Sequence, residues 1–135
     1  MERHCENARK VAEFLQQHPQ VSWVKYAGLV DHPEHQLAQR YMGGQPASIM
    51  SFGIQGGIEA AARFIDALKL VVRLVNIGDA KSLACHPAST THRQLNDEEL
   101  EKAGVPRDMV RLSIGIEHRD DIIADLEQAL AAAAA

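Results

Sequence analysis

The sequence alternates strictly between apolar and polar side chains over one stretch, Val110-Arg111-Leu112-Ser113-Ile114-Gly115. Successive side chains of a β-strand point to opposite faces of the sheet, so this pattern predicts a strand that is buried on one face only. The three aliphatic side chains belong to the buried face. Arg111 and Ser113 must then lie together on the opposite, polar face.

Working outward from this strand, β-branched and aromatic stretches alternate with stretches that have apolar residues at helical spacing. The predicted strands span residues 21–26, 47–54, 71–77 and 110–115. The predicted helices span residues 4–18, 33–41, 58–70, 96–103 and 120–130, and residues 79–87 are predicted to be irregular. This order favours a single α/β (α+β) domain over residues 1–135, with a small, mostly antiparallel sheet and helices packed on one face. The alanine-rich residues 131–135 are expected to fray.

Composition excludes several classes of protein. The 135 residues carry a net charge of −4 and only 4% aromatic side chains, which is unfavourable for binding nucleic acid. No apolar run approaches the roughly 20 residues of a membrane span, and the first residues lack the apolar segment of a secretory signal. Cys5 and Cys85 form no CxxC motif. A reducing, cytoplasmic location is therefore expected.

Three places could carry chemistry. The guanidinium of Arg111, fixed on a strand, could bind a substrate carboxylate through two hydrogen bonds, although a surface arginine more often pairs with Asp or Glu. The stretch Asn76-Ile77-Gly78-Asp79 leaves a polar side chain and free backbone at a strand end, but it could simply be a turn. The loop Ser89-Thr90-Thr91-His92 could meet a ligand or be held by its own hydrogen bonds.

Metal and nucleophile chemistry are disfavoured. The histidine pairs at 32 and 35 and at 86 and 92 have no third ligand at a fixed spacing, so no metal site is expected. Cys85 and His86 are adjacent and should point apart. The glycines at 53, 56 and 57 lack the lysine of a phosphate-binding loop and fit a tight turn better.

Four motifs in order, at residues 43–52, 76–83, 86–92 and 110–117, closely resemble the C-terminal domain of the Cys/Met-metabolism family of pyridoxal-phosphate (PLP) enzymes, which are fold-type I. With the ending at 120–130, the resemblance covers nearly the whole chain. Within the family, Asn76-Ile77-Gly78-Asp79 and the Ser-Thr-Thr-His loop look most like the O-acetylhomoserine sulfhydrylases. Methionine γ-lyases tend to have Ser-Leu-Gly-Asp and Ser-Met-Thr-His there.

The resemblance implies a role in methionine and cysteine biosynthesis, in a transferase that joins O-acetylhomoserine to sulfide or a thiol with loss of acetate. Related activities in the family are those of methionine γ-lyase, cystathionine γ-synthase and cystathionine γ-lyase. In this picture Arg111 matches the arginine that binds the substrate α-carboxylate. Asn76 and Ile77 would assist it, and Thr91 would line the same pocket.

The chain lacks the family's cofactor lysine in its Ser-x-Thr-Lys motif, the phosphate-binding turn, the stacking tyrosine and the aspartate that pairs with the cofactor ring. The resemblance therefore implies that the chain is about the last third of the enzyme, inactive alone, with no catalytic or cofactor-binding residue and no bound PLP. Residues 4–18 would be the end of an inter-domain helix. Its apolar side would be exposed for the missing N-terminal domain or for formation of a homo-oligomer.

Two other classes of function stay open: a non-catalytic module that binds amino-acid carboxylates, and a structural domain without a ligand. Amino-acid binding by the isolated chain would favour the module. A neighbouring reading frame with the lysine motif would favour the enzyme.

Overall fold

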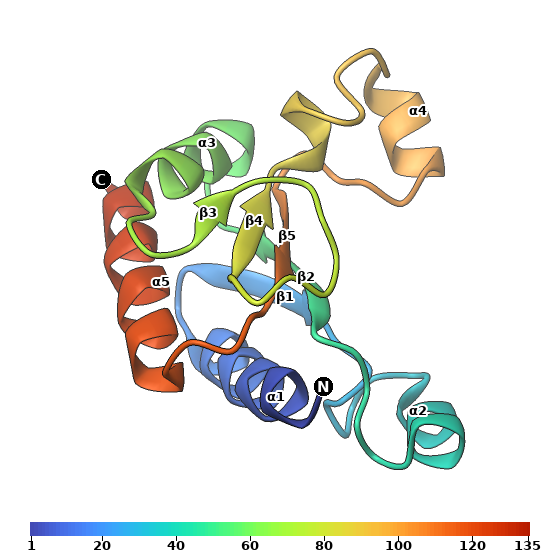
Figure 1. Cartoon of the computed structure of the whole chain (residues 1–135). Coiled ribbons are helices and arrows are strands. Elements are labelled where there is room, and N and C mark those ends of the chain that lie inside the picture. The colour runs from blue at the N-terminus through green and yellow to red at the C-terminus, as the bar shows by residue number, and fades with distance from the viewer.

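Helices and strands alternate along most of the chain in the computed structural model, which describes all of residues 1–135 (Figure 1). The exception is a pair of short strands, the third and fourth, that follow each other with no helix between them. The strands are β1 (Val21–Lys25), β2 (Ile49–Ile54), β3 (Val72–Arg73), β4 (Leu83–Cys85) and β5 (Met109–Ser113). The helices are α1 (Glu2–Gln17), α2 (His35–Met42), α3 (Gly57–Ala67), α4 (Asp97–Lys102) and α5 (Arg119–Ala134), with one 3-10 turn at Pro87–Ser89.

The five strands form one sheet in the order β1-β2-β5-β4-β3. The alternating strand, β5, is central and pairs antiparallel with β2 and β4. β1 pairs antiparallel with β2, whereas the edge strand β3 is parallel to β4. The predicted fold class, a mostly antiparallel sheet in an α/β domain, is confirmed.

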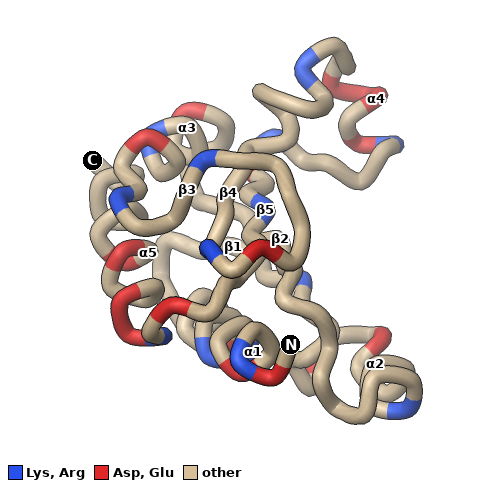
Figure 2. Tube along the Cα trace, in the orientation of Figure 1, with Lys and Arg blue, Asp and Glu red and all other residues tan.

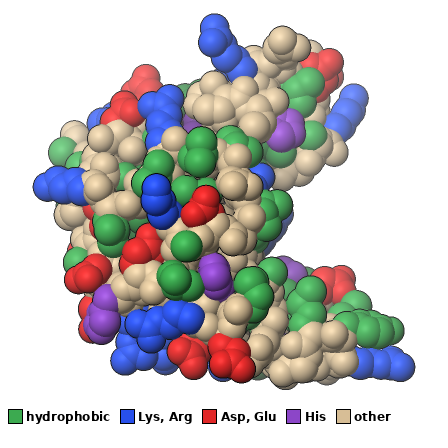
Figure 3. Space-filling view, viewed as in Figure 1, with side chains coloured by type: hydrophobic (Ala, Val, Ile, Leu, Met, Phe, Trp, Pro, Cys, Tyr) green, Lys and Arg blue, Asp and Glu red, His purple; other side chains and the backbone are tan.

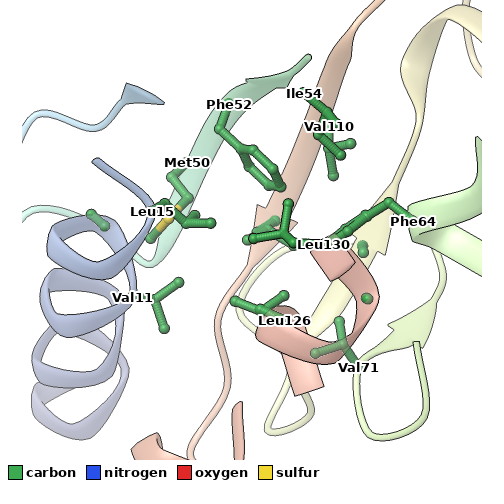
Figure 4. Close-up of a cluster of buried hydrophobic side chains, with 14 of the residues drawn as sticks. Val11, Leu15, Met50, Phe52, Ile54, Phe64, Val71, Val110, Leu126 and Leu130 are labelled. Carbon is green, nitrogen blue, oxygen red and sulfur yellow. The ribbon is translucent and has the colours of Figure 1, made fainter. Parts of the chain in front are cut away.

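The core lies between one face of this sheet and α1, α3 and α5, as Figure 4 shows. Phe52 packs edge-on against Phe64 of α3, with ring centroids 5.6 Å apart. Leu126 and Leu130 of α5 and Val110 of β5 are fully buried beside them. Burying a large aliphatic or aromatic side chain contributes roughly 1.5–3 kcal/mol, so this face supplies most of the folding free energy.

Two predictions about the strands were wrong. β3 has two residues rather than seven because its partner β4 has only three, and the chain leaves the sheet after the Leu74 N–H bonds the Ala84 carbonyl. β4 itself was predicted to be irregular. It is buried on both faces, so it shows no alternation, and its three residues are too few to give a period.

The apolar side of α1 differs from its prediction. Ala8, Val11, Ala12 and Leu15 are all 0% exposed because they pack inside this chain, against the sheet and α5. Most of the exposed large apolar side chains lie elsewhere, along residues 70–77 and around α2; Met1 and Ile116 are the others. α1 therefore completes the core of this chain and leaves no apolar side open.

The chain end is also more ordered than its alanine-rich composition predicted. α5 continues to Ala134, and Ala133 is 2% exposed. Arg63 of α3 donates to the Ala133 carbonyl through Nη2 at 2.8 Å and Nε at 3.3 Å, which satisfies a carbonyl that the helix end leaves open.

Acidic residues lie at the starts of two helices, α4 and α5 (Figure 2). The α4 start is a capping box, in which Asn96 and Glu99 each accept the other's backbone N–H. Negative charge at these ends complements the helix dipole.

Asp125 of α5, only 6% exposed, anchors the connection from α3 to β3. Its carboxylate accepts the N–H groups of Lys69, Leu70 and Val71 at 2.9 Å each. Burial by itself raises the pKa of Asp125, but the backbone donors and the Gln128 amide outweigh it and hold the pKa below the usual 3.8. The ionised carboxylate thus stabilises the fold.

We expect Asp125→Asn to lower the free energy of unfolding at pH 7 by about 2 kcal/mol, because hydrogen bonds to a charged acceptor are lost. A lowered folded pKa gives stability that is present above the unfolded pKa and lost as pH falls through the folded pKa. The difference from wild type should therefore shrink below about pH 4, as measured by urea unfolding at several pH values. The exposed Asp121→Asn serves as the control, and an equal effect there would contradict the assignment.

Candidate functional site

The sheet face opposite the core carries the polar side chains of β5. In the strand register Arg111 lies between Ser51 of β2 and Cys85 of β4. The segment around α4 covers one end of this face through a small apolar cluster of Ala88, Leu100, Val105 and Met109 packed on Trp23. Between the lobes that hold α4 and α2 the molecular surface is hollowed (Figure 3).

Arg111 and Ser113 project from this face, as the alternation predicted, and both contact the connection between β3 and β4. Arg111, which is half-buried, donates from Nη2 to the Asn76 carbonyl at 3.2 Å. The Gly78 N–H donates to Ser113 Oγ at 3.4 Å. The structure therefore brings Arg111 and Asn76 together, although they are 35 residues apart in the sequence.

Asn76 and Ile77 lie on the exposed side of this connection, which bends at Ile77. The Asn76 Oδ1 accepts the Ile77 N–H at 2.9 Å, and the Ile77 side chain is 65% exposed. The Arg111 guanidinium makes one hydrogen bond, to a neutral carbonyl, and no salt bridge. Its remaining N–H donors are thus available to an anion, unlike those of an arginine already paired with a carboxylate.

Thr91 is the one predicted site residue that makes no hydrogen bond to this group. Its hydroxyl pairs with His92 Nδ1 at 2.8 Å in an exposed loop. The neighbouring His86 is 2% exposed and fixes the loop: Nε2 lies 2.7 Å from the Arg107 carbonyl and Nδ1 2.8 Å from Ser89 Oγ. Because a carbonyl only accepts, Nε2 donates to the Arg107 carbonyl. This loop is held by its own hydrogen bonds.

Cys85 lies beside Arg111 but is not an activated nucleophile. The thiol is 4% exposed, and burial raises the pKa of Cys85, an effect that the Arg111 charge only partly offsets. His86 bonds to Ser89 and Arg107 instead of the thiol. A reactive cysteine needs a lowered pKa, so the site is built for binding rather than for attack by sulfur.

Sequence reasoning missed three residues behind this surface: Asn7, Ser82 and Glu117. They join α1, the β3–β4 connection and the end of β5 through buried and part-buried hydrogen bonds. Two signals could have found them. Asn7 is a polar residue four positions before Val11, on the apolar side of an amphipathic helix, and Gly115 follows a strand where close backbone approach favours glycine.

The residues present do not fit a PLP site. All five lysines are exposed, whereas a lysine that forms a Schiff base needs a pocket that lowers its pKa. No group of three or more His, Cys, Asp or Glu side chains is placed to hold a metal ion. None of the helices has the length and apolar character needed to cross a membrane.

Comparison with known proteins assigns the chain to a family. The model of the Cys/Met metabolism PLP-dependent enzyme family matches residues 1–131. The chain belongs to this family.

Three relatives agree with this assignment. The chain is 54% identical over 130 residues to O-acetyl-L-homoserine sulfhydrylase 1 of Thermus thermophilus, covering 96% of the chain and 31% of the relative. Homocysteine synthase of Schizosaccharomyces pombe is 50% identical, with 96% and 30% covered. L-methionine gamma-lyase of Pseudomonas putida is 48% identical, with 99% and 33% covered. The chain thus spans about a third of the length of these relatives.

A solved structure gives the same match in three dimensions. It is a Campylobacter jejuni protein described as an O-acetylhomoserine (thiol)-lyase, crystallised with N′-pyridoxyl-lysine-5′-monophosphate. The TM-score is 0.90 at 45% identity, and the match covers 96% of this chain and 31% of that one.

The contact between Arg111 and Cys85 can be tested by alkylation. In a Cys5→Ser background, Arg111→Gln should slow the reaction of Cys85 with iodoacetamide at pH 8 by a few-fold, because losing the positive charge raises the thiol pKa further. Arg119→Gln, at the start of α5, is the matched control. An unchanged rate for Arg111→Gln would place the guanidinium away from β4.

Proposed function

We propose that this chain is the C-terminal, substrate-side domain of an O-acetylhomoserine sulfhydrylase-like enzyme, in which Arg111 binds the substrate α-carboxylate. The observation that carries the proposal is the Arg111 guanidinium, which is held at the Asn76 carbonyl and has no acidic partner. The names of the relatives support the substrate class.

The carboxylate would lie against the free edge of the guanidinium. A planar fork of N–H donors matches a carboxylate with two parallel hydrogen bonds, and its charge persists at every physiological pH. Release of the Ile77 N–H from the Asn76 side chain would add a backbone donor on the same side. Thr91, on its own loop, would approach the substrate from the α4 lobe.

Arg111 and its neighbours would orient the substrate rather than move a proton. Fixing the carboxylate sets the direction of the rest of the amino acid, and such positioning lowers the entropic part of the barrier. The remaining two-thirds of the enzyme would hold PLP, supply the acid–base groups and cover the exposed apolar residues along 70–77. The assembled enzyme would be a homo-oligomer.

The test uses an enzyme in which residues 1–131 replace the matching segment of the Thermus thermophilus relative. We expect Arg111→Ala in this enzyme to lower kcat/KM for O-acetyl-L-homoserine by about 10- to 100-fold, mainly through KM, as removal of a charge-assisted bidentate contact should. The PLP spectrum should not change. Unchanged steady-state kinetics would show that Arg111 does not bind the substrate carboxylate.

The same assays separate the candidate reactions. Homocysteine formed from O-acetyl-L-homoserine and sulfide supports the proposal. Faster elimination from L-methionine would favour the γ-lyase function suggested by the 48% identity to the Pseudomonas putida enzyme. Millimolar or tighter binding of amino acids by the isolated chain would favour a binding module.

The isolated chain should not form a stable PLP adduct. After incubation with PLP, gel filtration and borohydride reduction, we expect no visible absorbance band above that of a control protein with exposed lysines, because every lysine is solvent-exposed. The segment-swapped enzyme is the positive control. A stoichiometric adduct on one lysine of this chain would contradict the proposal that the remaining two-thirds of the enzyme holds PLP.

A further inference from the structure

The connection between β3 and β4 is fixed at its buried end by Glu117, just after β5. Both carboxylate oxygens bind the same residue: Ser82 N donates to Oε1 at 2.6 Å and Ser82 Oγ donates to Oε2 at 2.8 Å. The same hydroxyl accepts the Gly115 N–H at 2.9 Å. Ser82 is 0% exposed; its bond to Gly115 is buried, and its two bonds to Glu117 are part-buried.

Asn7 of α1 holds the other side of this junction. Its side-chain amide, 1% exposed, donates to the Gly115 carbonyl at 3.1 Å and to the Glu117 carbonyl at 2.8 Å. Both N–H groups of the amide are therefore used on one short piece of backbone. α1 and Glu117 fix the same turn from opposite sides.

The packing at this junction leaves no room for adjustment. A Cβ on Gly115 would meet the Ala80 carbonyl and lie 2.5 Å from the Lys81 carbonyl carbon, closer than real Cβ atoms come. The Ile116 N–H also donates to Ala80 O at 2.9 Å. The register between residues 80–82 and 115–117 is thus set by sterics as well as by hydrogen bonds.

The bonds at the exposed end of the same connection are longer. Arg111 reaches Asn76 O at 3.2 Å in an exposed hydrogen bond, and Gly78 N reaches Ser113 Oγ at 3.4 Å in a part-buried one. Hydrogen bonds of this length add little by themselves. The position of Asn76 beside the guanidinium therefore depends on the shorter bonds a few residues along the chain.

We propose that Glu117 and Asn7 are positioning residues for the carboxylate site, holding residues 76–82 against β5 so that Arg111 and the Ile77 backbone face one ligand. The inference rests on the proposed function of Arg111. Neither residue contacts the ligand. They act through Ser82 and Gly115, and weakening them lets the connection and the guanidinium take other positions.

The test uses the PLP-loaded, segment-swapped enzyme and three variants. Glu117→Ala removes both acceptors, whereas Glu117→Gln keeps one acceptor and can donate to Ser82 Oγ. The exposed Glu6→Gln, next to Asn7, is the matched control. We expect Glu117→Ala to raise KM for O-acetyl-L-homoserine about tenfold or more, with kcat within about threefold and an unchanged PLP spectrum. Glu117→Gln should recover most of the loss, and Glu6→Gln should equal the parent.

A second measurement covers failure of Glu117→Ala to fold. In the isolated chain, Ser82→Ala should speed amide hydrogen exchange at Gly78 and Lys81 by about tenfold or more while core amides of β5 keep their protection, and Glu117→Gln should have a much smaller effect. Uniform acceleration throughout the chain, or loss of kcat with KM unchanged, would overturn the inference and leave Glu117 as a general stabilising group. Normal kinetics for Arg111→Ala would instead overturn the proposed function, and the inference with it.

Discussion

The structure depends on the strict alternation of β5. This strand lies in the middle of the sheet, so its apolar residues must complete the core under α1, α3 and α5, and Val110 and Leu112 are 0% exposed there. The side-chain period of a strand then forces Arg111 and Ser113 to the other face. The burial that stabilises the domain therefore also decides the face of the sheet on which the Arg111 guanidinium lies.

The surroundings of Arg111 and Ser113 on the polar face are set by the β3–β4 connection. The β3–β4 connection passes beside β5 and meets both of its polar side chains (Figure 1). Its inner end is locked by Ser82 and Glu117, and its outer end presents Asn76 to solvent. A rigid inner end with an open outer end is the arrangement expected of a surface that receives a small acidic ligand and a covering domain.

Patterns local in sequence predicted much of this molecule. The alternation of residues 110–115 gave the central strand and the face of Arg111, and helical spacing gave five helices within a few residues of their bounds. β4 was not predicted because a three-residue strand buried on both faces shows no periodicity of apolar residues. The alanine-rich end of α5 was predicted to fray because composition does not reveal that Arg63, 70 residues earlier, binds the Ala133 carbonyl.

The candidate site was only partly visible from the sequence. Arg111 and Asn76 came from strand and turn patterns together with the family resemblance, and the fold places them in contact. The network of Asn7, Ser82 and Glu117 was not predicted, because it joins residues 35 to 110 positions apart and such pairs follow from topology rather than local pattern. The apolar side of α1 was misassigned for the same reason, since its partner α5 lies at the far end of the sequence.

The most direct measurement is a crystal structure of the PLP-loaded, segment-swapped enzyme with an unreactive amino-acid analogue of O-acetyl-L-homoserine. The account predicts the analogue's carboxylate on the Arg111 guanidinium through two hydrogen bonds of about 2.7–2.9 Å. A carboxylate held by other residues, with Arg111 still bonded only to the Asn76 carbonyl, would contradict it.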